Sequence, residues 1–95
     1  MSEKELARIK KLFGANLKKI RDSKNLSLLE ADYVSELNES NISKYENGKR
    51  EPQLSTIIKL AKMLKIHPKE LLDFGIDFTP ESPNKESAEE GSSGA

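Results

Sequence analysis

Apolar residues in this chain recur at intervals of three and four positions, which is the repeat of one face of an α-helix. One such series predicts a helix from Glu3 to about Lys24, and it consists of Leu6, Ile9, Phe13, Leu17 and Ile20. A second series predicts a helix over 54–64, and it consists of Leu54, Ile57, Ile58, Ala61 and Leu64. No segment shows the alternation that is typical of a β-strand, so we expect an all-α fold.

Helix-capping residues predict further helices between and after these two. Ser27 and Glu30 have the spacing of a capping box, which predicts a helix that ends near Ser35. Pro68 stands where a first helical residue is expected and predicts a short helix near the end of the folded part. Gly14 interrupts the first helical pattern at a cost of about 1 kcal/mol relative to Ala, so we expect a bend there.

A third helix is predicted from Glu39 to Asn47. Asn38 is a favourable N-cap for it, and Gly48 can adopt the left-handed conformation that follows a helix end. The expected total is therefore five helices. A short turn separates the capped second helix from this third one, which is the order of a helix-turn-helix.

The predicted third helix has two different faces. On a helical wheel, five polar residues fall within about 140° of one another, and they are Glu39, Ser40, Ser43, Lys44 and Asn47. Ile42, Tyr45 and Glu46 occupy the opposite arc. We expect Ile42 and Tyr45 to dock the helix, so that short polar side chains face outward. The major groove of DNA, about 12 Å wide, admits such a helix and offers hydrogen-bonding base edges.

Glu46 falls on the arc that is expected to be buried. An unpaired carboxylate is costly there, so Glu46 needs a cationic partner. Arg21, late in the first helix, is the candidate. We interpret Arg21 and Glu46 as a structural ion pair.

Composition and charge restrict the remaining possibilities. The 95 residues suit one small domain, and the absence of cysteine excludes disulfides and thiolate metal sites. No apolar run spans a membrane and no signal peptide is evident, so we expect a cytoplasmic protein.

Charge is distributed unevenly along the chain. Residues 1–78 carry 15 basic and 12 acidic side chains, whereas residues 79–95 carry one basic and four acidic side chains. We expect a mildly basic folded part, which permits nucleic-acid binding, and a disordered acidic tail.

Between Leu17 and Asp73 the chain resembles the lambda-repressor-like (Cro-type, XRE family) helix-turn-helix domains of bacterial and phage regulators. The resemblance implies a five-helix fold and a transcriptional regulator that binds double-stranded DNA as a homodimer on a palindromic operator. It rests on three stretches, "LKKIRDSKNLSLLEA", "LNESNISKYENGKREPQL" and "IIKLAKMLKIHPKELL". A phage-type repressor, a restriction–modification controller and an antitoxin all fit this description.

The resemblance also assigns roles to residues. Those expected at base edges are Glu39, Ser40, Asn41, Ser43 and Lys44. Those expected at phosphates are Ser27, Asn38, Asn47, Lys49 and Arg50. Arg21 and Glu46 match the family's internal ion pair. The expected organisation is a helical N-terminal extension over 1–16, the domain over 17–73 with its motif at about 28–47, an apolar segment over 74–78, and the tail over 79–95.

Three positions depart from the family pattern. Leu28 replaces a glutamine that contacts DNA, Asp32 replaces a small apolar residue, and Glu36 replaces a glycine in the turn. Acids near the groove weaken the approach to phosphates. Together with Glu39, these residues favour an alternative in which the fold serves as a protein-interaction module or an antitoxin subunit that binds a partner protein.

Several residues keep two interpretations. Glu39 either accepts a hydrogen bond from cytosine N4 or is a helix N-terminal acid favoured by the dipole. Lys44 reaches either guanine or a phosphate, and His67 is better explained as a helix cap or a surface residue than as a metal ligand. The basic residues of the first helix favour a solvated face over a binding site, and they are Lys10, Lys11, Lys18 and Lys19.

The end of the folded part is unusually apolar. Its candidate dimer contacts are Leu71, Leu72, Phe74, Ile76 and Phe78. Leu71 and Leu72 are expected to face inward from the fifth helix, and the surplus is expected to contact a second copy. The sequence has no nucleophile–base arrangement and no phosphate-cradling glycine loop, so we expect neither an enzyme nor a cofactor.

Overall fold

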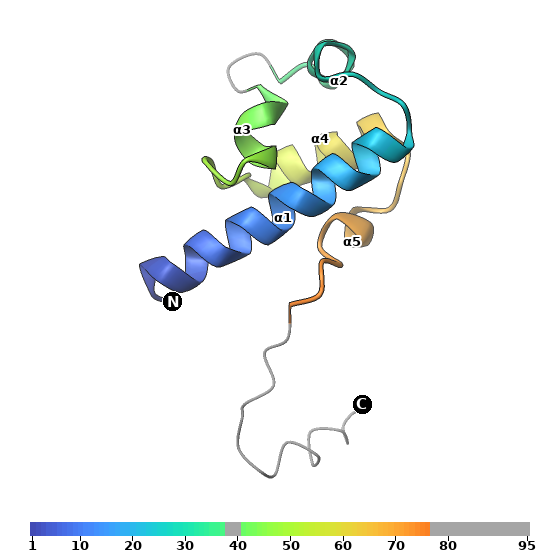
Figure 1. Ribbon diagram of the computed structural model, residues 1–95. Helices are drawn as coiled ribbons and strands as arrows, with labels where there is room; N and C mark the ends of the chain where they lie inside the picture. Colours follow the sequence, from blue (N-terminus) through green and yellow to red (C-terminus); the bar gives the residue numbers. More distant parts are fainter. Residues whose placement is uncertain (38–40, 77–95) are drawn as a thin grey trace, which may run out of the picture.

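Five helices make up the described part of the chain (Figure 1). The structure is a computed structural model, which describes residues 1–37 and 41–76. Its helices are α1 (Glu3–Ser23), α2 (Leu28–Ser35), α3 (Ile42–Glu46), α4 (Leu54–Leu64) and α5 (Pro68–Leu71). Within those residues there is no strand, and no helix is both long and apolar enough to cross a membrane. The all-α class with five helices is confirmed, whereas the tail over 79–95 lies outside the described residues.

Side-chain caps explain where α2 and α5 begin. The capping box of α2 is complete, because Ser27 Oγ accepts from Glu30 N–H at 3.1 Å and Glu30 Oε1 accepts from Ser27 N–H at 2.9 Å. The pKa of Glu30 is lowered, first by the hydrogen bond that its carboxylate accepts from the Ser27 backbone and then by a hydrogen bond with the Ser27 side chain. At α5, His67 Nδ1 accepts from Lys69 N–H at 3.0 Å, which confirms the interpretation of His67 as a cap.

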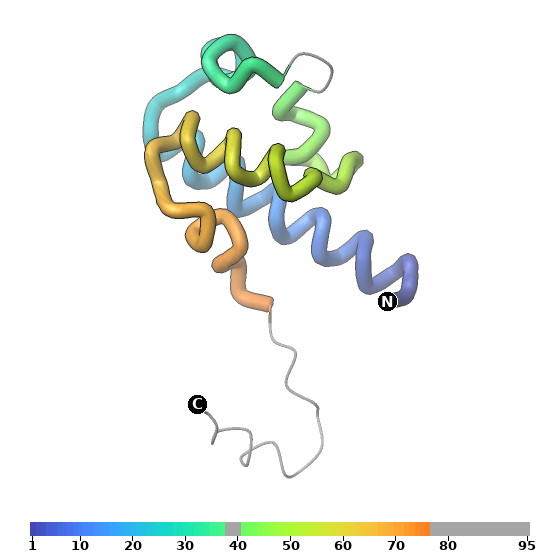
Figure 2. The backbone as a smooth tube through the Cα atoms, turned by 180° about the vertical axis from the view of Figure 1, so that it is seen from behind, coloured from blue at the N-terminus to red at the C-terminus, as the bar shows by residue number. Residues whose placement is uncertain are grey.

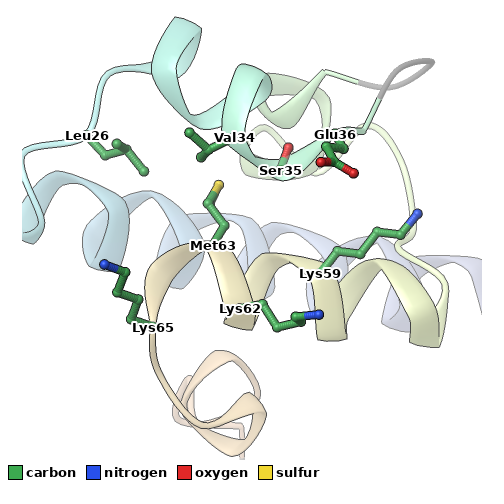
Figure 3. Close-up of a pocket in the computed structure, with 8 residues that line it drawn as sticks. All are labelled: Leu26, Val34, Ser35, Glu36, Lys59, Lys62, Met63 and Lys65. Atoms are coloured by element: carbon green, nitrogen blue, oxygen red, sulfur yellow. The ribbon is translucent and has the colours of Figure 1, made fainter.

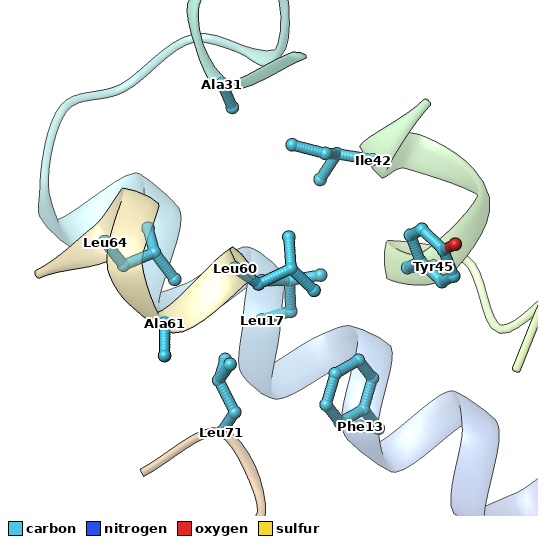
Figure 4. Packing of buried hydrophobic residues seen from close by; sticks show 9 residues of the cluster. All are labelled: Phe13, Leu17, Ala31, Ile42, Tyr45, Leu60, Ala61, Leu64 and Leu71. Carbon is cyan, nitrogen blue, oxygen red and sulfur yellow. The ribbon is translucent and has the colours of Figure 1, made fainter. Parts of the chain in front are cut away.

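One hydrophobic core joins the five helices (Figure 4). It consists of Phe13 and Leu17 from α1, Ala31 from α2, Ile42 and Tyr45 from α3, Leu60, Ala61 and Leu64 from α4, and Leu71 from α5. Seen from behind, α4 crosses α1, with α2 above and α5 below (Figure 2).

The buried Asn16 side chain donates to the carbonyl oxygens of Glu70 at 2.8 Å and Leu71 at 3.2 Å, so it fixes α5 to α1.

Only one of the two leucines that were expected to face inward does so. Leu71 is fully buried in the core, whereas Leu72 is 53 % exposed. The reason is that α5 ends at Leu71, and Leu72 is its C-cap. The prediction for Leu72 is therefore wrong.

The third helix is shorter than predicted. It begins at Ile42 instead of Glu39, its N-cap is Asn41 instead of Asn38, and it ends at Glu46. Gly48 follows with a φ of +71°, as the expected glycine after the helix end.

Gly14 is a point of helix contact and not a bend. α1 runs without interruption from Glu3 to Ser23, and Gly14 is buried within it. A Cβ atom at Gly14 would lie against the carbonyl oxygens of Tyr45 and Glu46, and 2.6 Å from the carbonyl carbon of Glu46. The predicted bend is wrong because the glycine serves close packing, which lets the backbone of α3 rest directly on α1.

We expect Gly14→Ala to lower the free energy of unfolding by about 1–3 kcal/mol, because the added methyl group overpacks a contact between two backbones. In an exposed helix the same change would stabilise by about 1 kcal/mol. Urea unfolding followed by circular dichroism distinguishes these signs. A stabilised variant would contradict the contact.

Candidate nucleic-acid interface

α3 presents the two faces that the helical wheel predicts. Ile42 is fully buried and Tyr45 is 4 % exposed, and both side chains lie in the core (Figure 4). The polar side chains of this segment stay at least partly exposed, and they are Asn41, Ser43, Lys44 and Asn47. Three predicted contact residues lie outside the described residues, namely Asn38, Glu39 and Ser40.

Asp32 of α2 caps the start of α3. Its Oδ1 accepts a hydrogen bond from the Ile42 N–H at 2.8 Å, across ten residues of sequence. The N-cap residue Asn41 makes no capping bond itself, and its Oδ1 accepts from Ser43 Oγ at 2.6 Å instead. A helix start needs an acceptor for its free amides, and a carboxylate is well suited because of the helix dipole. Asp32 therefore has a structural role that explains why an acid stands at this position.

The other end of α3 is fixed by the predicted ion pair. Arg21 Nε lies 2.5 Å from Glu46 Oε2, and Arg21 Nη2 donates to Glu46 Oε1 at 3.1 Å. Arg21 and Glu46 are only 6 % and 8 % exposed. The hydrogen bond with Glu46 raises the pKa of Arg21 against the opposing effect of burial. Arg21 Nη1 also donates to the carbonyl oxygen of Leu26 at 2.6 Å, so one side chain connects α1, α3 and the segment that precedes α2.

The turn after α3 presents the two predicted phosphate-binding cations. Lys49 N–H donates to the carbonyl oxygen of Lys44 at 2.9 Å, which folds the turn back on the helix. Gly48 permits this turn through its left-handed backbone. The side chains of Lys49 and Arg50 are exposed, next in sequence to the outward face of α3.

α2 packs against α3 and carries exposed apolar residues. Ser27 is exposed and its hydroxyl caps the helix, whereas Leu28 packs against the core. Leu29 and Tyr33 are 80 % and 84 % exposed, and both line a shallow pocket with Asn41. The search for apolar residues at helical spacing did not single out Leu29 and Tyr33, because these two side chains do not lie on the buried face of α2. Their spacing of four residues was the available signal.

Comparison with known proteins assigns this arrangement to a family. The helix-turn-helix family model matches residues 17–71, more than half of the chain. The chain is also 40 % identical over 67 residues to the control protein C.BamHI of Bacillus amyloliquefaciens, covering 70 % of this chain and 83 % of that protein. The chain belongs to the lambda-repressor-like (XRE-type) helix-turn-helix family. This membership confirms the expected class of function, a sequence-specific DNA-binding regulator of transcription.

A solved structure of the same family has the same fold. It is the crystal structure of the restriction-modification controller protein C.AhdI from Aeromonas hydrophila, which matches with a TM-score of 0.62 and 37 % identity. The match covers 65 % of this chain and 94 % of that chain.

The helix-turn-helix family often has glycine where this chain has Glu36, and the backbone explains why. Glu36 is the C-cap of α2 and has a φ of +59°, a left-handed conformation that glycine adopts without cost. Leu28 also departs from the family. It packs against the core, whereas the glutamine that the family usually has at this position contacts DNA.

The C-terminal apolar residues divide into core and surface. Leu71 belongs to the core, which removes it as a dimer candidate. Phe74 packs partly against the core, with its ring 6.4 Å from that of Phe13 in an edge-to-face arrangement. Leu72 is exposed and Ile76 is half-buried, whereas Phe78 lies outside the described residues.

We expect Asp32→Ala to lower the free energy of unfolding by about 0.5–2 kcal/mol, the usual cost of losing a helix cap. The matched control is Asp73→Ala, which removes an exposed carboxylate after α5. Urea unfolding measures both variants. Equal effects in the two would contradict the capping role.

Proposed function

We propose that this helix-turn-helix protein reads DNA by inserting α3 into the major groove. The supporting observation is that α3 is fixed on its inner side by Ile42, Tyr45 and Glu46 while its polar side chains face outward. Side chains of this kind match the donors and acceptors of base edges, and their short length lets the helix backbone approach the bases. A rigidly held helix keeps these groups in one register on the duplex.

The residues divide into two roles under this proposal. Asn41, Ser43 and Lys44 contact base edges, together with the preceding Glu39 and Ser40. Phosphates are held by Ser27, Asn38, Asn47, Lys49 and Arg50. Phosphate contacts set affinity and its salt dependence, whereas base contacts set the preferred sequence.

We further propose that the protein acts as a homodimer on a palindromic operator. Two copies of α3 would enter successive major grooves about 34 Å apart. The exposed Leu72 and the half-buried Ile76 are the residues that we assign to the contact between copies.

The proposed biological setting is control of a restriction–modification system. C.BamHI is named a control protein and C.AhdI a restriction-modification controller, and this chain is 40 % and 37 % identical to them. Under this proposal the operator lies next to the genes that the protein controls.

We expect Lys44→Ala and Lys49→Ala to weaken DNA binding in different ways. The operator would first be obtained by selection from random duplexes. Lys44→Ala should cost about 1–3 kcal/mol on the operator and relax its sequence preference, because a base contact is lost. Lys49→Ala should weaken operator and random DNA alike and reduce the salt slope by about 1. Fluorescence anisotropy at several salt concentrations measures both effects.

If Lys49→Ala changed the preference while Lys44→Ala did not, the assigned roles would be wrong. If the protein bound no duplex even at low salt, the proposed function itself would fail.

We expect Leu72→Asp to convert a dimer into a monomer in sedimentation velocity, because a charge would enter an apolar contact. Leu29→Asp is the matched control, since Leu29 is more exposed and lies on α2. A wild-type monomer, or a Leu72→Asp variant that remains dimeric, would contradict the assigned interface.

A further inference from the structure

The N-terminal half of α1 precedes the segment that matches the helix-turn-helix family. That match begins at residue 17, whereas α1 begins at Glu3. In both views of the backbone, this half of the helix extends on the side of the molecule where the turn after α3 lies (Figures 1 and 2). The extension therefore lies beside the segment to which we assign phosphate binding.

Lys11 is the residue of α1 against which this turn packs. A Cβ atom on Gly48 would lie 2.9 Å from Lys11 Cγ and 3.1 Å from Lys11 Cα, so the two backbones are in close contact. Lys49 and Arg50 follow Gly48 directly. The same helix is held again one turn later, where Gly14 packs on the carbonyl groups of Tyr45 and Glu46. These two contacts fix the position of Lys11 relative to the end of α3.

The four lysines that were interpreted together as a solvated face have different surroundings. Lys18 forms an ion pair with Asp22 at 3.1 Å. Lys19 lines a shallow pocket near α5, and Lys10 is half-buried. Lys11 is exposed, and no carboxylate in the described part of the chain lies within 4.0 Å of its ammonium group.

We propose that Lys11 binds a DNA phosphate, and that the N-terminal half of α1 thereby extends the phosphate contacts made by the turn after α3. Lys4 stands seven residues earlier, two turns away on the same face of α1, and continues this line of positive charge. This inference rests on the proposed function, since it needs α3 to enter a groove. It adds a binding surface outside the segment that the family model covers.

The test compares the salt dependence of DNA binding in three variants of the full chain. Lys11→Gln removes the charge, Lys11→Arg retains it, and Lys62→Gln is the matched control. Lys62 is an exposed lysine of α4 that lines the groove between α2 and α4 with Val34 and Met63 (Figure 3). Operator and random duplexes are titrated at several salt concentrations, and thermal unfolding verifies that each variant is folded.

Each phosphate contact contributes about 0.9 to the slope of log K against log salt. We expect Lys11→Gln to lower the magnitude of the slope by about this amount, with an unchanged ratio of operator to random binding. Lys11→Arg and Lys62→Gln should keep the wild-type slope. If Lys11→Gln keeps the slope while the wild-type protein binds operator, this inference fails and the proposed function stands. If the wild-type protein binds no duplex, both fail.

Discussion

The buried ion pair between Arg21 and Glu46 is the interaction on which the position of α3 depends. Arg21 contacts Glu46 with two nitrogens and the Leu26 carbonyl oxygen with a third, so it links α1, α3 and the segment that precedes α2. A buried pair gains little net stability, because desolvation of both charges opposes their attraction. Its larger effect is geometric. Two hydrogen bonds between the same two side chains restrict how α3 lies on α1.

A helix of five residues has no stability of its own, so tertiary contacts must hold α3 at both ends. Asp32 caps its first turn and Arg21 holds its last, while Gly14 allows its backbone to rest on α1. These contacts all lie on the inner side or at the ends of the helix. The outward Lys44 makes none of these contacts, which leaves its side chain available for recognition of DNA.

Features encoded by local sequence could be predicted, and features set by distant contacts could not. The bounds of α2 and α4 follow from a capping box and from apolar spacing, and both agree with the structure. The start of α3 was misplaced because its cap comes from Asp32, ten residues earlier. Gly14 was misinterpreted for the same reason, since only the crossing of two helices gives it a role. The ion pair was predictable because Glu46 fell on a buried arc, where the sequence offered Arg21 as a partner.

The most direct test of this account is a double-mutant cycle on the ion pair, with Arg21→Met, Glu46→Gln and the double variant unfolded in urea. We predict that Glu46→Gln lowers the free energy of unfolding by about 3–5 kcal/mol, because the buried Arg21 then loses its buried counter-charge. It keeps only the exposed Asp22, whose Oδ1 lies 3.5 Å from Arg21 Nη1. The double variant should lose less than the sum of the two single changes. Single losses below about 0.5 kcal/mol that simply add, as for an exposed pair, would contradict the claim that this pair positions α3.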